Sequence, residues 1–126
     1  MIAYLDTNAV LRLAQGRARA MGTEASRLIR RADLAISPMV LLEMEYLFEI
    51  GRLRLPARDI LLKAEHELDL RLCDLPFAEV SRVALDEKWT RDPFDRVIVA
   101  QAKVNGLAPL ISADEVIAEH YPRTVW

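Results

Sequence analysis

The chain has 126 residues, 52% of them apolar, and its 17 basic and 19 acidic residues give a net charge of −2. This length predicts one domain spanning residues 1–126, large enough to bury a core without disulfides. The charge balance excludes a generally basic, histone-like nucleic-acid binder, although local patches can still contact RNA. Cys73 is the only cysteine, which excludes an internal disulfide and a cysteine-rich zinc site. Without a signal-peptide pattern or an apolar run of about 18 residues, we expect a soluble cytoplasmic protein with no membrane contact.

Apolar runs and turn signals alternate along the chain in a regular order. Strands are predicted at residues 2–5, 34–36, 70–74, 110–111 and 124–126. Helices are predicted at residues 8–15, 23–31, 38–50, 56–69, 76–86 and 93–105, and from residue 114 onward. Thr23 is the expected N-cap of the second helix, and Asn105-Gly106 supplies a left-handed stop. Short strands alternating with helices indicate βα units, hence a largely parallel sheet with helices on both faces.

The first strand ends on an acid, Asp6, and the chain then turns into a helix. This places the carboxylate at the carboxyl edge of the sheet, where ligands bind in open α/β folds. Asp6 is equally well explained as the N-cap of that helix, with Thr7 and Asn8 as polar support. An aspartyl-phosphate phosphatase or receiver fits less well, because Asn8 stands where a second acid is needed and Lys103 lies within a helix.

Glu43 is surrounded by apolar positions on its own helix. Its neighbours three and four residues away are Met39, Val40, Tyr46 and Leu47, so Glu43 is predicted to lie on the buried stripe. A carboxylate in such surroundings is costly unless it is protonated, paired or bound to metal. A partner arginine or a partly hydrated edge would also account for it.

Two further acids are candidates near the end of the chain. Asp92 has a structural explanation, since it can cap the helix that follows and pair with Arg96 four residues on. Asp95 has no such explanation, and its helical neighbours are apolar. Asp114 follows the strand at 110–111, as Asp6 follows the first strand, and it could also be an N-cap.

Taken together, the acids predict a metal-dependent nuclease site built from distant parts of the chain: Asp6, Glu43, Asp95 and Asp114. Oxygen ligands without a cysteine or histidine set favour Mg²⁺, with Mn²⁺ as a substitute, over zinc. We expect Asp6 and Asp95 to be direct ligands. The other two acids would bind a second metal or orient the attacking water and act as its base. Arg91 and Arg96 are candidates for holding the RNA phosphate backbone.

Four short motifs, in order along essentially the whole chain, resemble the PIN-domain ribonucleases, and most closely the VapC-type toxins of toxin–antitoxin pairs. They are Asp6-Thr-Asn8, Ser37-Pro38 followed by Glu43, Arg91-Asp-Pro-Phe-Asp-Arg96 leading into Ala100-Gln-Ala102, and Leu110-Ile-Ser-Ala-Asp114. Each motif is weak alone, but their combination at this chain length is specific. The resemblance places the acidic quartet of the family on the four acids named above, with Asp92 as an occasional helper.

The resemblance also implies a fold, partners and a supporting residue. The implied fold is a three-layer α/β/α sandwich with parallel strand order 3-2-1-4-5. The implied partners are an RNA substrate, a second copy of the chain in a homodimer, and an antitoxin whose tail lies across the active-site groove. Ser112 stands where family members often carry threonine, and its hydroxyl is expected to keep the supporting hydrogen bond. The alternative is a non-catalytic PIN-like module that binds RNA or protein.

Overall fold

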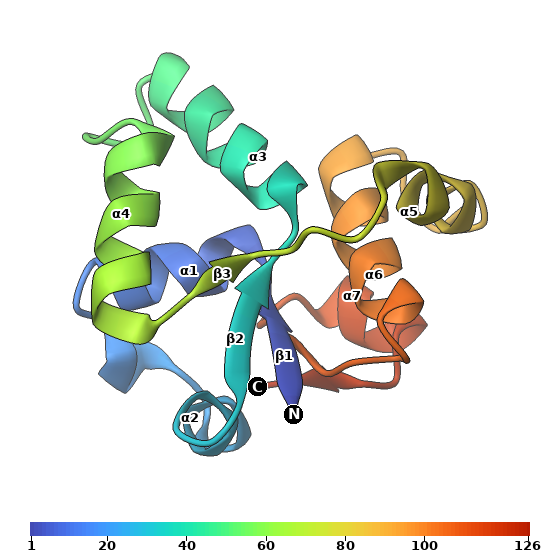
Figure 1. Cartoon of the computed structure of the whole chain (residues 1–126), viewed down its shortest axis with the longest axis horizontal. Coiled ribbons are helices and arrows are strands. Elements are labelled where there is room, and N and C mark those ends of the chain that lie inside the picture. The colour runs from blue at the N-terminus through green and yellow to red at the C-terminus, as the bar shows by residue number, and fades with distance from the viewer.

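The computed structural model describes residues 1–126, and its centre is one parallel sheet (Figure 1). The five strands are β1 (Ile2–Leu5), β2 (Asp33–Ile36), β3 (Arg71–Leu72), β4 (Leu110–Ile111) and β5 (Thr124–Val125). They lie in the order β3-β2-β1-β4-β5, and every neighbouring pair is parallel. The predicted parallel sheet and its strand order 3-2-1-4-5 are therefore confirmed.

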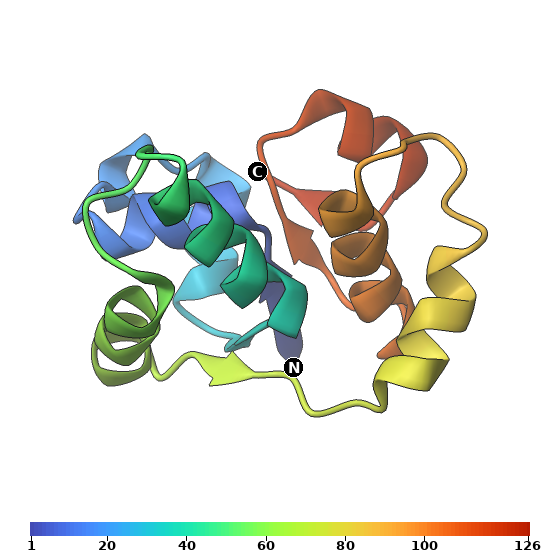
Figure 2. The same ribbon diagram turned by 90° about the horizontal axis from the view of Figure 1, so that it is seen from above.

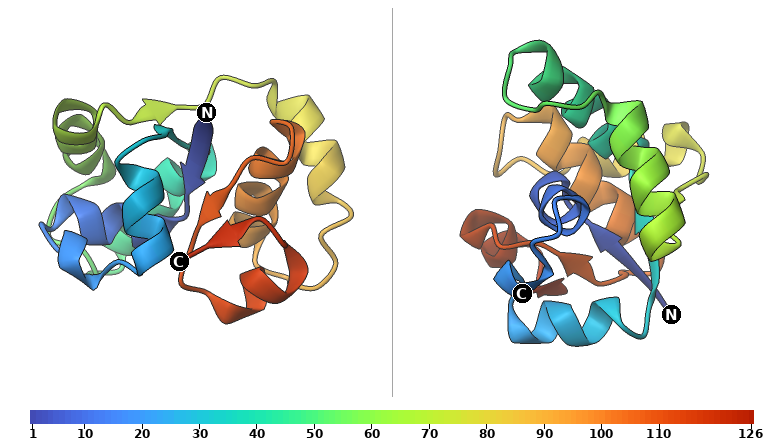
Figure 3. Two further views of the ribbon diagram at one scale, coloured as in Figure 1. Left: turned by 90° about the horizontal axis from the view of Figure 1, so that it is seen from below. Right: turned by 90° about the vertical axis from the view of Figure 1, so that its left-hand side faces the viewer.

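Seven α-helices and one short 3₁₀ helix surround the sheet. They are α1 (Thr7–Ala14), η1 (Ala18–Ala20), α2 (Thr23–Ile29), α3 (Pro38–Glu49), α4 (Ala57–Leu68), α5 (Phe77–Ala84), α6 (Pro93–Val104) and α7 (Glu115–His120). Figure 2 shows α1 and α4 on one side of the sheet and α5 and α6 on the other, which is the predicted α/β/α layering. Helix α3 lies at one end of the molecule and α2 at the other, and α4 runs along the side between them (Figure 3). None of these helices combines the length and the apolarity needed to cross a bilayer.

Three predicted elements differ from the observed ones. The strand expected at 70–74 is only two residues long, because β3 is an edge strand that pairs with β2 alone. The helix expected at 76–86 is the shorter α5, and α2 ends two residues early, at Ile29. Thr23 is the first residue of α2, and Gly22 precedes it as N-cap. A Cβ atom at Gly22 would lie 2.3 Å from the carbonyl carbon of Trp126, so that close approach needs glycine.

The buried core follows from the position of each strand. Strands β1, β2 and β4 have neighbours on both sides, and each contributes a continuous apolar run, which is typical of a parallel sheet covered on both faces. A smaller apolar cluster lies between α5 and α6 and consists of Val80, Ala84, Val97 and Ala100. Helix α5 therefore packs mainly on α6, and α6 in turn contacts α3.

The strand order reverses direction between β1 and β4. From β1 the chain proceeds to β2 on one side, whereas β4 and β5 lie on the other side. In open α/β sheets such a reversal opens a crevice at the carboxyl ends of the two strands. Leu5 pairs with Ile111 in the register, so the residues that follow them, Asp6 and Ser112, emerge side by side at this crevice.

Candidate active site

Asp6 is fixed at the end of β1 by contacts to both of its carboxylate oxygens. Its side chain is buried, with 6% of the residue exposed. Oδ1 accepts a hydrogen bond from the backbone N–H of Ala9 at 2.9 Å, and Oδ2 accepts one from Ser112 Oγ at 2.5 Å. The expected N-cap and the expected Ser112 hydrogen bond are both present. Asp6 therefore caps α1 and still lies at the crevice.

Asp114 and Asp92 also cap helices, and each uses only one oxygen to do so. Asp114 Oδ1 accepts from the backbone N–H groups of Val116 at 2.8 Å and Ile117 at 3.1 Å. Asp92 Oδ1 accepts from the N–H of Phe94 at 2.8 Å. The second oxygen of each carboxylate makes no hydrogen bond and remains available for a ligand. The backbone N–H of Asp114 also donates to Ser112 Oγ at 3.1 Å, which ties Asp114 to Asp6.

Glu43 extends from α3 toward the start of α1. The hydroxyl of Thr7 donates to Glu43 Oε1 in a short hydrogen bond. The predicted buried stripe is only partly buried: Val40 is fully buried, but Tyr46 is 48% exposed, so Glu43 lies at the rim of the core. The Tyr46 ring packs against that of Phe94 with centroids 6.0 Å apart, which holds α3 beside the start of α6.

Thr7 and Asn8 do not support Asp6 in the way the sequence suggested. The Thr7 hydroxyl contacts Glu43 instead, and Asn8 is exposed and makes no side-chain hydrogen bond. Thr7 begins a helix, and its side chain faces α3 across the crevice. Nothing in the sequence links Thr7 to a residue 36 positions away, so this contact could not be predicted.

Asp95 lies half-buried in the first turn of α6 and makes no hydrogen bond or ion pair. Burial, followed by the nearby carboxylates of Asp92 and Glu43 and more weakly by Asp114 and Asp6, raises its pKa from 3.8 to about 7. A position in the first helical turn would by itself favour the charged form. Burial and the like charges therefore outweigh the helix dipole at Asp95.

The other two acids show the same mutual influence. Burial raises the pKa of Asp6, the hydrogen bonds from Ser112 and Ala9 lower it, the charge of Asp114 raises it further, and the charge of Arg12 lowers it. Burial also raises the pKa of Glu43, the Thr7 hydrogen bond opposes this, and the charges of Asp92 and Asp6 add to it. The fold therefore brings all four predicted acids, and Asp92, into one electrostatically coupled group.

No cation forms an ion pair with this group, although the charge of Arg12 acts on Asp6 and lowers its pKa. The ion pairs in the protein join Met1 to Asp33, Arg27 to Glu24 and Lys103 to Glu87. The predicted pairing of Asp92 with Arg96 is wrong, because Arg96 Nε donates to the carbonyl of Thr90 at 2.9 Å. Arg91 is exposed and donates to the carbonyls of Lys88 and Thr90. Both arginines therefore brace the segment before α6 and leave the acids unpaired.

The donor atoms suit a hard divalent cation, since they are carboxylate oxygens that form no ion pair with a positive side chain. No three acidic, histidine or cysteine side chains are arranged as a ready-made metal site, however. Repulsion between uncompensated carboxylates favours such separation. Asp95 is the acid without any hydrogen bond or ion pair, so it is the side chain with the most freedom to move toward a cation.

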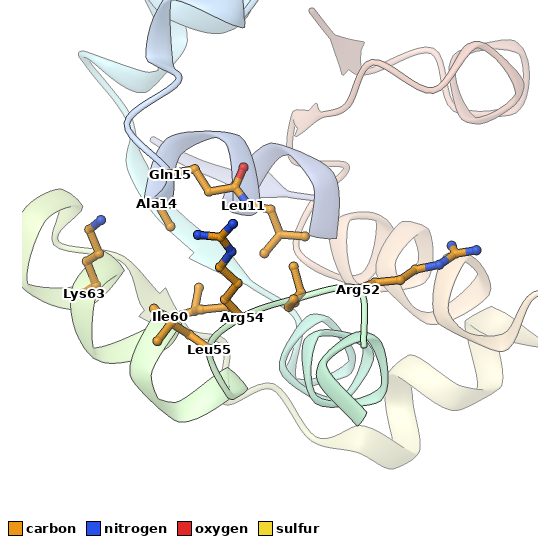
Figure 4. Close-up of a pocket in the computed structure, with 9 residues that line it drawn as sticks. Leu11, Ala14, Gln15, Arg52, Arg54, Leu55, Ile60 and Lys63 are labelled. Atoms are coloured by element: carbon orange, nitrogen blue, oxygen red, sulfur yellow. The ribbon is translucent and has the colours of Figure 1, made fainter. Parts of the chain in front are cut away.

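Two apolar hollows lie away from the acids. One, of about 520 Å³, is lined by residues of α1, α4 and the loop before α4, including Leu11, Arg54 and Ile60 (Figure 4). The other, of about 590 Å³, lies between α3 and α4. None of the four acids lines either hollow, so size and apolarity do not identify the candidate site.

The fold and the site define a class: a parallel α/β domain whose switch-point crevice is lined with unneutralised carboxylates. The chain belongs to the PIN domain family, whose model matches residues 3–121. PIN domains are generally nucleases, and PIN nucleases use divalent metal ions. Among curated proteins, none gives a significant sequence match.

Two solved structures show the same fold over nearly the whole chain. A toxin–antitoxin complex from Klebsiella pneumoniae is similar with a TM-score of 0.67 and 19% identity, covering 98% of this chain and 96% of that one. VapBC2 from Rickettsia felis, bound to a DNA fragment from its promoter, is similar with a TM-score of 0.63 and 17% identity, covering 99% and 96%. These likenesses show that the fold is shared over nearly the whole length of the chain.

Proposed function

We propose that this chain is a metal-dependent endoribonuclease that acts as the toxin of a toxin–antitoxin pair. The observation that carries the proposal is the state of Asp95. This carboxylate is half-buried among other acids, has no hydrogen bond or cationic partner, and has a pKa raised to about 7. A structural carboxylate is normally paired when it is buried. An unpaired one in a group of acids fits a site for a cation.

The four acids divide into two pairs by their proposed roles. Asp6 and Asp95 are the direct ligands of Mg²⁺, for which Mn²⁺ can substitute. Glu43 and Asp114 hold a second ion or orient the attacking water. When bound, the metal supplies positive charge that acidifies water and offsets the charge developing on the phosphate.

The chain's own groups then hold and move protons around the scissile phosphate. Ser112 fixes the orientation of Asp6 through its 2.5 Å hydrogen bond. Thr7 does the same for Glu43, which leaves Glu43 Oε2 free to accept a proton from the attacking water. Asp95 must lose its own proton before it can act as a ligand. Asp92 is an accessory acid beside it, and Asn8 is a polar group at the edge of the crevice.

Arg91 and Arg96 are proposed to contact the RNA backbone. Each uses part of its guanidinium on backbone carbonyls of the segment before α6, and further N–H groups remain for phosphate oxygens. They flank Asp92 and Asp95 in the sequence. Phosphates held there would lie next to the acids, as cleavage of an RNA strand requires.

Protein partners are supported by an exposed apolar row on α3. Leu42 and Tyr46 of α3 and its C-cap residue Ile50 are spaced four residues apart, and each is about half exposed. Exposed apolar rows of this kind mark protein interfaces. We assign an antitoxin as one partner, in line with the toxin–antitoxin complexes among the similar structures. A second copy of the chain is the other partner we propose, and the cytoplasm is the proposed location.

The test is cleavage of structured RNA with Mg²⁺ or Mn²⁺ by the parent and by two variants, Asp6→Asn and Asp95→Asn. We expect each variant to lose about 100-fold or more in rate, since each change removes a carboxylate that would hold the metal. Asp59→Asn changes an exposed acid on α4 and serves as the matched control. Cutting by both variants at the parent's rate would reject the assignment.

A second candidate is a non-catalytic PIN module that binds RNA or protein. It is favoured by the absence of a ready-made group of three metal ligands. This candidate predicts that the parent binds RNA without cutting it and that Mg²⁺ and Mn²⁺ have no effect. Gel-shift and cleavage assays on the same RNA separate the two candidates.

A further inference from the structure

A second buried acid, Glu87, lies in the segment that connects α5 to α6, residues 85–92. This connecting segment is not part of the acid group, but it ends at Asp92, the N-cap of α6. Glu87 is 2% exposed, although it belongs to a residue type that is seldom fully buried. Its contacts explain how such burial is tolerated, and they link it to the elements that carry the candidate site.

Both carboxylate oxygens of Glu87 have a partner. Oε1 forms a close ion pair with Nζ of Lys103, near the end of α6. Oε2 accepts a hydrogen bond of 2.6 Å from the indole Nε1 of Trp89. A buried carboxylate satisfied in this way fixes the geometry of its partners, because every alternative arrangement leaves a charge unpaired. Glu87 therefore anchors the connecting segment to α6.

The same contacts extend to α7. The ring of Trp89 stacks on that of His120, the last residue of α7, with centroids 5.1 Å apart and planes 7° from parallel. Lys103 Nζ lies 6.0 Å from the centre of the Tyr121 ring. Tyr121 in turn donates a hydrogen bond of 2.5 Å to the carbonyl of Ala108, just before β4. One buried acid thus joins α6, α7 and the connecting segment.

These three elements carry three of the acids around the crevice. The connecting segment ends at Asp92, α6 bears Asp95 in its first turn, and α7 begins after Asp114. Further along the segment, the Thr90 hydroxyl accepts from the Asp92 N–H at 3.1 Å, and the Thr90 carbonyl accepts from Arg96. The segment is therefore held at both of its ends.

From these contacts we infer that Glu87 is a positioning residue for the acid group, acting through Lys103 and Trp89. It sets the placement of α6 relative to α7, and hence the distance between Asp95 and Asp114 across the acid group. The expected effect on cation binding rests on the proposed metal site. The placement itself can be measured without metal.

The experiment compares Glu87→Gln with the parent and with Glu79→Gln, which makes the same change at an exposed position of α5. Thermal melts first establish a temperature at which all three proteins are folded. Amide and indole ¹H–¹⁵N spectra of the metal-free proteins then report geometry, and Mn²⁺ titration calorimetry reports affinity. We expect Glu87→Gln to shift the Trp89 indole signal and the amides of Asp95 and Asp114. We expect its Mn²⁺ affinity to fall about threefold to tenfold.

A double variant, Glu87→Leu with Lys103→Met, guards against a simple loss of folding. Replacing both members of a buried ion pair by apolar residues is often neutral for stability. It still removes the acceptor of the Trp89 hydrogen bond, so the same spectral shifts and weaker Mn²⁺ binding are expected.

The outcomes are distinguishable. Spectral changes confined to residues 87–89, with parental Mn²⁺ affinity, would overturn the positioning role and leave a purely structural one. Absence of Mn²⁺ binding by the parent would reject the proposed metal site, and the amides of Asp95 and Asp114 would still decide the positioning role.

Discussion

The protein buries acidic side chains in two places, and the two differ in what surrounds them. Glu87 is almost completely buried, and both of its oxygens are satisfied by Lys103 and Trp89. Asp95 is only half-buried, and it has neither a cation nor a hydrogen bond. A carboxylate in a protein interior needs a counter-charge or a proton. Glu87 has its counter-charge within the chain, whereas Asp95 has none. The comparison supports the proposal that the acid group binds a cation from outside the chain.

The largest expected effect comes from removing the internal counter-charge. Lys103→Met leaves Glu87 buried without its cation, so the free energy of unfolding should fall by about 3 kcal/mol. Urea unfolding at neutral pH measures this loss. Lys63→Met makes the same change at an exposed position of α4 and should stay within about 0.5 kcal/mol of the parent. Equal stability of the two variants would show that Glu87 does not depend on Lys103.

A change of opposite sign in the free energy of unfolding is expected at the acid group. In metal-free protein at pH 8, Asp95→Asn removes a repelled charge, so it should raise the free energy of unfolding by roughly 1 kcal/mol after allowance for solvent screening. Urea unfolding with EDTA present measures the change, and Asp59→Asn is the exposed control. A destabilised Asp95→Asn variant would mean that Asp95 has a stabilising partner.

The same repulsion is expected to appear in the pH dependence of stability. The pKa of Asp95 is about 7 in the folded protein and about 4 in the unfolded chain, so the folded state holds the proton more tightly. Stability of the metal-free parent should therefore fall as the pH rises from 4 to 7 and then level off. Asp6 and Glu43, whose pKa values are also raised, contribute with the same sign. Asp95→Asn should lose only part of the slope; an unchanged slope would contradict the assignment.

Local sequence signals predicted the parts of the site that depend on neighbouring residues. An apolar run ending on Asp6 marks a strand end, and Asp92 and Asp114 each precede a helix whose N–H groups need a cap. All three caps are present. The strand order was expected from the family resemblance, since it depends on contacts between distant strands.

Long-range side-chain contacts could not be predicted in the same way. The partner of Glu43 is Thr7, and that of Glu87 is Lys103, sixteen residues away on another element. The contact made by the Arg96 side chain also differed from expectation. A spacing of four residues allows an ion pair with Asp92, but Arg96 donates to the Thr90 carbonyl instead. Spacing defines which groups can meet, and tertiary packing selects among them.

The most direct test of the account is a calorimetric titration of the parent and of Asp95→Asn with Mn²⁺ at pH 6 and pH 8. The account predicts binding by the parent that strengthens toward pH 8, because Asp95 must first lose its proton. It also predicts that Asp95→Asn binds at least about tenfold more weakly at pH 8. Equal affinities for the two proteins, or parental binding that does not change with pH, would contradict it.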